Sequence, residues 1–164
     1  MTNSAETLAV GKKTSSWTRL VLWNLALLTV NWVAASFNYY MLTFYMKYVP
    51  GDIYVNSTVG AFAEIAGDIV AGILMKWLGF KAAFVIAFII AGIGGFCIGF
   101  ISTSGVGIAF FVLWAKFGIS FAFNLCYLAI PVLFPVEIAS TCFGVVNVFA
   151  RFISIISPIT AEWA

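Results

Sequence analysis

The sequence predicts an all-α fold, a polytopic bundle of transmembrane helices. Of its 164 residues, 63% are hydrophobic and only 9% are charged, whereas an average soluble domain has roughly 25% charged residues. The apolar residues gather in stretches of about 20 or more, enough for an α-helix to cross a hydrocarbon core about 30 Å thick. Several such stretches follow one another along the chain. We therefore exclude a soluble domain and expect a bundle of membrane spans.

The chain divides into a polar N-terminal segment and a transmembrane domain. Residues 1–16 are polar and lack the short apolar core of a signal peptide, so we expect a cytosolic tail or a linker between the halves of a larger chain. Residues 17–164 are expected to form the transmembrane domain. Its five predicted spans are about 17–48, 53–78, 82–102, 107–130 and 138–163.

Turn residues set the boundaries between these spans. Pro50 and Gly51 end the first. The second and third are joined by residues 79–81 alone, so these two helices should be antiparallel neighbours. Residues 102–105 end the third span, and Pro131 is expected to end the fourth because proline has no N–H to continue a helix.

Basic residues indicate the orientation of the chain in the membrane. The N-terminal segment and the second-to-third turn carry five of them, and the opposite side carries only Lys47. The five are Lys12, Lys13, Arg19, Lys76 and Lys81. Because cytoplasmic loops carry an excess of Lys and Arg, we expect a cytosolic N-terminus.

Composition also argues against several other classes of function. A net charge of +2 gives no basic surface for nucleic acid, so no nucleic-acid partner is expected. The chain has no histidine, and Cys97, Cys126 and Cys142 sit in apolar stretches without ligand spacing, so we expect core packing and no metal site or cofactor. No Ser/His or metal constellation supports an enzyme.

Four charged residues lie away from the ends of the predicted spans, and a charge at the bilayer centre costs about 2.5 to 3.5 kcal/mol on insertion scales. Glu64 and Asp68 are four residues apart and share a helix face, where two carboxylates repel unless one is protonated or a cation is near. Lys116 and Arg151 need a visiting anion or a carboxylate partner. Such groups usually face a cavity or one another, so they are candidate binding residues.

Polar side chains recur at helical spacing in three further patterns. These are Asn24, Asn31 and Asn38; Lys116, Ser120, Asn124 and Tyr127; and Asn147, Arg151, Ser154 and Pro158. The stripes either line a site or form interhelical hydrogen bonds worth about 0.6 kcal/mol each. Four aromatic residues likewise either line a pocket or pack: Trp32, Tyr39, Tyr40 and Phe121. Gly95 and Gly99 are predicted to allow close helix packing.

An ordered series of motifs carries a family resemblance. The motifs are 35–40 with 51–56, 64–66 with 78–81, 116–118 through 124, 133–135, Gly144, 150–151 and Pro158. In order and spacing they resemble the C-terminal half of the organic cation/anion transporter family of the major facilitator superfamily. The resemblance covers nearly everything from Arg19 onward and implies that the five spans correspond to the family's helices seven to eleven.

The chain departs from this family at several positions. The family's paired arginines after its eighth helix are here Phe80 and Lys81. The charged and polar residues around its Leu-Tyr-Pro motif are replaced by Val132, Val136 and Ala139, while Glu137 lies nearby. Ala66 stands where the family usually has proline. These changes remove the charges that latch the cytosolic side in the family.

The resemblance bears on substrate charge in two opposing ways. Asp68 lies near a position that can be basic in anion carriers, whereas Arg151 matches a basic position of that branch. Substrate charge is therefore left open between anions, cations and zwitterions. The substrate-binding residues implied are Asn38, Tyr39, Tyr40, Glu64, Asp68, Lys116, Asn124 and Arg151.

The resemblance implies a fragment of a secondary-active transporter for small organic ions or related solutes, working by alternating access in the full-length protein. Expected partners are a small organic solute, the lipid bilayer, and the missing N-terminal half or another chain. The expected location is the plasma membrane or a vesicle membrane. The alternative is a non-transporting membrane subunit derived from a half-carrier, which the lost latch charges favour and the retained intramembrane charges disfavour.

Overall fold

The computed structural model describes residues 3–101 and 105–163, with side chains for residues 18–100 and 107–163. Over the described residues it is helical and has no strand. The elements are α1 (Asn3–Tyr45), a short 3-10 helix η1 (Met46–Tyr48), α2 (Ile53–Leu78), α3 (Phe80–Ile101), α4 (Gly105–Leu133), α5 (Val136–Ser154) and α6 (Ser157–Trp163). The predicted all-α fold is confirmed.

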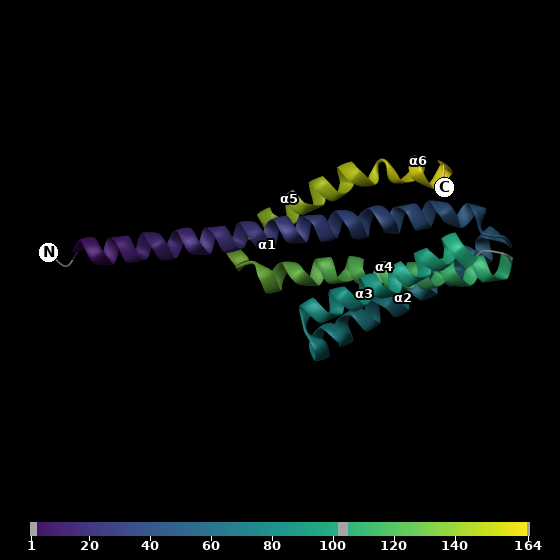
Figure 1. The fold of residues 1–164 in the computed structure, drawn as a ribbon, viewed down its shortest axis with the longest axis horizontal. Coiled ribbons are helices and arrows are strands. Elements are labelled where there is room, and N and C mark those ends of the chain that lie inside the picture. The colour runs from purple at the N-terminus through teal and green to yellow at the C-terminus, as the bar shows by residue number, and fades with distance from the viewer. Residues whose placement is uncertain (1–2, 102–104, 164) are drawn as a thin grey trace.

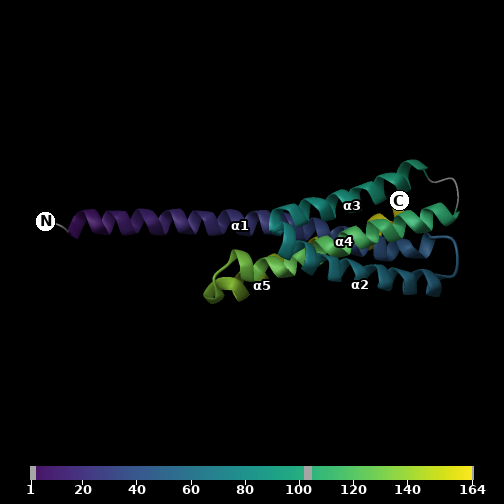
Figure 2. The ribbon, with the colours of Figure 1, turned by 90° about the horizontal axis from the view of Figure 1, so that it is seen from below.

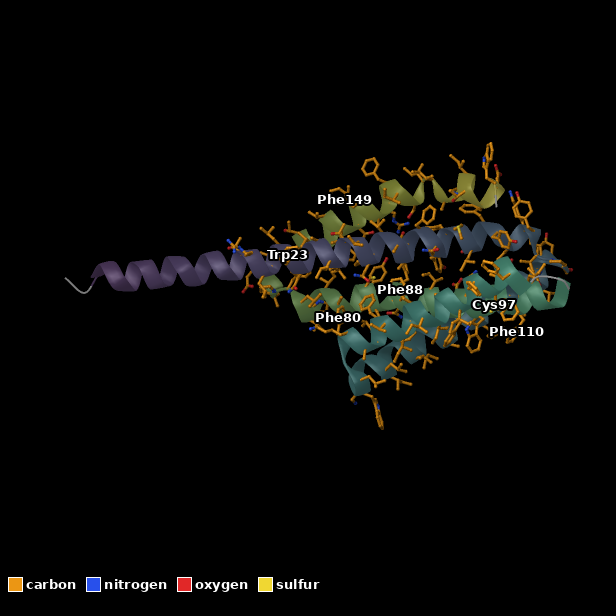
Figure 3. The ribbon with its side chains drawn as sticks, viewed as in Figure 1. Trp23, Phe80, Phe88, Cys97, Phe110 and Phe149 are labelled. Carbon is orange, nitrogen blue, oxygen red and sulfur yellow. The ribbon has the colours of Figure 1, made fainter. Side chains whose placement is uncertain are left out.

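In the part of the chain that the structure describes, five segments are long and apolar enough to cross a membrane. They are Thr18–Tyr48, Ile53–Leu78, Phe80–Phe100, Gly107–Leu133 and Val136–Trp163. α1 begins well before its apolar part, so residues 3–17 form a helical extension that projects beyond the bundle in Figure 1. Phe110 and Phe149, labelled in Figure 3, are 57% and 55% exposed on the outer surface, as suits side chains that face lipid.

α1 lies between two layers of the bundle (Figure 1). It packs against α4 on one side and against α5 and α6 on the other, while α2 and α3 pack against α4. α4 is the central helix, since half of its most apolar stretch is buried, compared with 17–22% for the other spans. Figure 2 shows α3 and α2 diverging on either side of α4.

Two glycines allow α3 and α4 to approach closely. A Cβ at Gly118 would lie 2.5 Å from the backbone nitrogen of Ala91, and one at Gly94 would lie 2.7 Å from that of Ala115. The prediction that Gly95 and Gly99 make the close contact is therefore wrong, because a Cβ at either would meet nothing within 4 Å. α3 does carry small residues at the predicted spacing. The face that packs on α4 is that of Gly94, which is rotated by one residue, or about 100°, from the face of Gly95.

The short turns agree with the predicted boundaries. Gly51 and Gly79 both have positive φ, at 118° and 78°, which glycine adopts without steric cost. Gly79 alone separates α2 from α3, which confirms that these spans are antiparallel neighbours. Asp52 caps α2 by accepting a hydrogen bond of 2.8 Å from the Tyr54 backbone N–H.

The largest differences from the predicted boundaries lie near two prolines, Pro131 and Pro158. α4 continues through Pro131 to Leu133, because the Phe134 N–H still donates to the Ile130 carbonyl at 3.1 Å and closes the last turn. The last span is not one helix, since α5 ends at Ser154 and α6 begins at Ser157. Pro158 has no N–H for the Ser154 carbonyl, which instead accepts a bond of 2.8 Å from the Ser157 hydroxyl.

Candidate functional site

An ion pair between α2 and α4 forms the centre of the site. The Lys116 Nζ lies 2.8 Å from Glu64 Oε1, and the two side chains are 6% and 25% exposed. The close approach depends on glycine in α2: a Cβ at Gly67 would lie 2.9 Å from the Phe117 carbonyl oxygen, and one at Gly60 would lie 3.4 Å from Lys116 Nζ. The pair thus satisfies the predicted need of a membrane-embedded lysine for a carboxylate.

Tyr39 connects this ion pair to α1. Its hydroxyl donates to Glu64 Oε2 at 3.1 Å, so each oxygen of the Glu64 carboxylate has a partner. Its ring stacks on Phe123 of α4, with centroids 5.3 Å apart and planes at 11°. Three helices are therefore tied together around one carboxylate.

Arg151 of α5 reaches the same region through Tyr40. Its guanidinium donates a hydrogen bond to the Tyr40 hydroxyl and lies 5.7 Å from the centre of that ring, within the range of a cation–π interaction. The rings of Tyr39 and Tyr40 meet edge to face at 5.5 Å. The two tyrosines therefore join Arg151 to the ion pair of Glu64 and Lys116.

Two charges of the site have no ionic partner. Among the described residues the ion pairs are Lys116 with Glu64 and Lys47 with Glu162. Asp68 lies one turn after Glu64 on the same side of α2, and both it and Arg151 are exposed. After Lys116 and Glu64 neutralise each other, the site keeps one negative charge on α2 and one positive charge on α5.

A buried aromatic cluster supports the tyrosines. Trp32 is 1% exposed, and its ring centroid lies 6.4 Å from Phe123, 4.6 Å from Tyr127 and 5.6 Å from Phe143. Phe121 is fully buried in the core. Of the alternatives left open, Trp32 and Phe121 therefore pack, whereas Tyr39 and Tyr40 carry the polar contacts.

The structure separates one predicted site residue from the others. Asn38 lines a different hollow, between α1 and α3, and its amide donates to the Ala34 carbonyl at 2.8 Å. Asn124 is half-buried two turns after Lys116 on α4. Glu64 and Arg151 contact Tyr39 and Tyr40 directly, and Lys116 does so through Glu64. Asp68 lies one turn along α2 from Glu64.

Sequence reasoning missed one residue of the site, Phe123, and two polar contacts between helices outside it. Phe123 lies seven residues after Lys116, a spacing that places both on one face of α4 and gave a usable signal. Ser36 of α1 shares a hydrogen bond of 2.7 Å with Ser154 of α5. Lys47 and Glu162, 3.2 Å apart, join the far end of α1 to α6. Nothing in the spacing of Ser36, Lys47 or Glu162 along the chain marks these partners.

Comparison with known proteins gives no match to any family model. The chain is 29% identical over 131 residues to a Caenorhabditis elegans protein whose name proposes a transporter, covering 80% of this chain and 27% of that protein. It is 26% identical over 144 residues to the human organic cation/carnitine transporter 2, covering 83% and 25%. It is 27% identical over 148 residues to mouse solute carrier family 22 member 4, covering 82% and 25%.

These similarities confirm the predicted resemblance to organic cation/anion transporters. The chain spans about a quarter of the length of the curated relatives it matches. With five apolar spans among its described residues, it is a multi-pass membrane protein similar to transporters.

Proposed function

We propose that this chain forms one wall of the solute path in a secondary-active carrier of small organic ions. The observation that supports this most directly is a pair of opposite charges, Asp68 beside Glu64 and Arg151 on Tyr40, neither of which forms an ion pair with another described residue. Charges within membrane spans are costly and usually mark solute or ion paths. The similarity to transporters points the same way.

We propose further that the site takes ligands carrying both charges. A ligand cation would lie near the Asp68 carboxylate, which forms no ion pair with another described residue. A ligand anion would accept hydrogen bonds from the Arg151 guanidinium, whose planar fork suits a carboxylate. The Glu64–Lys116 pair would remain closed and hold α2 and α4 in place.

The proposed carrier is longer than this chain. Transporters of the superfamily place the solute near the bilayer midplane between two halves that rock around it, and a quarter of a relative's length provides only part of such a path. We therefore propose that these residues act with an N-terminal half, in the plasma membrane or a vesicle membrane. A native polypeptide of 17.8 kDa in immunoblots of native membranes would instead support the non-transporting subunit.

Charge-changing variants at the two free charges test the proposed ligand class. In uptake assays with the full-length protein, we expect Arg151→Gln to lower uptake of anionic and zwitterionic probes by roughly tenfold or more, the loss of about 1.5–3 kcal/mol for a charged hydrogen bond. Asp68→Asn should instead lower uptake of cationic and zwitterionic probes. Lys47→Gln, at the far end of α1, is the control. Unchanged charge preference in both site variants would contradict the proposal.

The proposed orientation places the turn between α2 and α3 in the cytosol. With the native cysteines replaced, Lys81→Cys should react with a membrane-impermeant maleimide only after permeabilisation, because the basic side of the chain faces inward. Tyr54→Cys, at a position 81% exposed near the opposite ends of the spans, should react in intact cells. If Lys81→Cys were labelled in intact cells and Tyr54→Cys were not, the orientation would be the reverse of the one proposed.

A further inference from the structure

The last span has a break near its end. α5 ends at Ser154 and α6 begins at Ser157, with Ile155 and Ile156 between the two helices. Pro158 has no N–H for the Ser154 carbonyl, which accepts a hydrogen bond of 2.8 Å from the Ser157 hydroxyl instead. Sharp bends in helices occur mostly at prolines and similar interruptions. The break is therefore a place where α6 can turn relative to α5.

α5 is firmly anchored on one side of this break. The Phe143 ring lies 5.6 Å from that of Trp32, which is buried in α1. Val146 is fully buried about one turn later, and the Ser154 hydroxyl at the end of α5 lies 2.7 Å from that of Ser36 in α1. Packed large side chains and a hydrogen bond that is partly buried both oppose detachment of a helix. We therefore expect α5 to stay in place on α1.

α6 is held more weakly on the other side of the break. Among the described elements it packs chiefly against α1, alongside which it lies in Figure 1. The two side chains that it buries, Ser157 and Ala161, are small, whereas its larger side chains, Ile159 and Trp163, are exposed. Segments with few buried contacts open at a low free energy. α6 is thus the part of this span that separates from α1 most easily.

An ion pair fastens the free end of α6 to η1, at the end of α1. The Lys47 Nζ lies 3.2 Å from Oε1 of Glu162, in the last turn of α6, and 4.7 Å from the centre of the Tyr48 ring. The side chains of the pair are 43% and 62% exposed, so dissolved ions reach them. Ion pairs between exposed groups weaken as the salt concentration rises. The attachment of α6 therefore depends on the surrounding solution.

We propose that α6 is a movable end segment of the bundle, hinged at Ile155 and Ile156 and fastened by the pair of Lys47 and Glu162. When salt screens this pair, α6 swings away from α1 while α5 stays in place. The movement also changes the surroundings of Arg151, because Ile155 lines the hollow of about 290 Å³ beside that side chain. In the proposed carrier, opening admits solutes of any charge toward Arg151 from this end, and this last step alone rests on the proposed function.

Cysteine reactivity at Ala161 tests the movement in the full-length protein in lipid nanodiscs. With the native cysteines replaced, Ala161→Cys places a thiol on the buried face of α6, where a water-soluble maleimide should react slowly. Lys47→Gln should raise the labelling rate about two- to fivefold, the effect of losing an exposed ion pair on a two-state equilibrium. Raising the salt concentration from about 0.1 M to about 1 M, which shortens the Debye length from about 10 Å to about 3 Å, should do the same. In Lys47→Gln, salt should have no further effect.

Two further cysteine positions and a charge exchange test the hinge and the pair. Ala150→Cys, equally buried but on α5, should stay unreactive throughout, and Trp163→Cys, exposed at the end of α6, should react at one rate throughout. Lys47→Glu should speed labelling of Ala161→Cys, and adding Glu162→Lys should reverse that effect.

Two results would overturn the proposal. A labelling rate of Ala161→Cys that changes neither with salt nor in Lys47→Gln would leave α6 fixed to α1. A parallel increase at Ala150→Cys would show that α5 and α6 leave α1 together, without a hinge between them. Because labelling does not require transport, either failure is distinct from a failure of the proposed function.

Discussion

Glu64→Gln is expected to lower the free energy of unfolding by about 3 kcal/mol, the lower end of the range for breaking a buried ion pair by removing one partner. The substitution leaves Lys116, 6% exposed, without a carboxylate at 2.8 Å. Glutamine keeps an oxygen that can still accept the hydrogen bond from Tyr39, so the loss reports the missing charge. Unfolding in mixed detergent–lipid micelles measures it.

The companion variants separate the charge from the contacts. Glu64→Gln with Lys116→Met removes both charges and should recover most of the loss, since a buried ion pair and an apolar replacement of similar volume are often close in stability. Asp68→Asn, in the same helix and without an ion pair, should change stability by no more than about 0.5 kcal/mol. A double variant no more stable than Glu64→Gln alone would refute this account of the pair.

Most of the fold could be predicted from the sequence because each span must form its own backbone hydrogen bonds in lipid. Length and hydropathy therefore located the spans, and Gly79 located the tightest turn. The break between α5 and α6 was missed because it depends on the Ser157 hydroxyl taking over the carbonyl that Pro158 leaves without an N–H. Such a local exchange of hydrogen bonds leaves the hydropathy of the span unchanged.

The charged residues of the candidate site could be predicted from the sequence, but the contacts that they form with one another could not. Intramembrane charge alone pointed to Glu64, Asp68, Lys116 and Arg151. Which carboxylate meets Lys116 depends on the register between α2 and α4, which backbone contact at Gly67 sets. Asn38 was grouped with the site because it belongs to the stripe of Asn24 and Asn31 and to the family motif at 35–40. Neighbours on a helix point about 100° apart, and Asn38 lines a hollow toward α3, away from Tyr39.

The helices pack most tightly where α4 contacts α3. There, Gly118→Ala is expected to lower the free energy of unfolding by about 3 kcal/mol, the upper part of the usual range for overpacking. A Cβ there would lie 2.5 Å from the backbone nitrogen of Ala91 and 2.9 Å from its Cα. Backbone atoms cannot rotate away as a side chain does, so the two helices must separate. Gly94→Ala, with a Cβ 2.7 Å from the Ala115 nitrogen, should have a similar effect.

Gly95→Ala is the matched control, since it makes the same substitution at the next residue of α3. A Cβ there meets nothing within 4 Å, and replacing glycine by alanine in a helix gains up to about 1 kcal/mol of helix propensity, so the variant should be neutral or slightly more stable. The free energies of unfolding of the three variants, compared in one micelle system, measure the difference. If Gly95→Ala and Gly118→Ala lowered the free energy of unfolding equally, the close packing of Gly118 on Ala91 would be contradicted. The packed face of α3 would then be the one with Gly95 and Gly99, as small-residue spacing alone predicted.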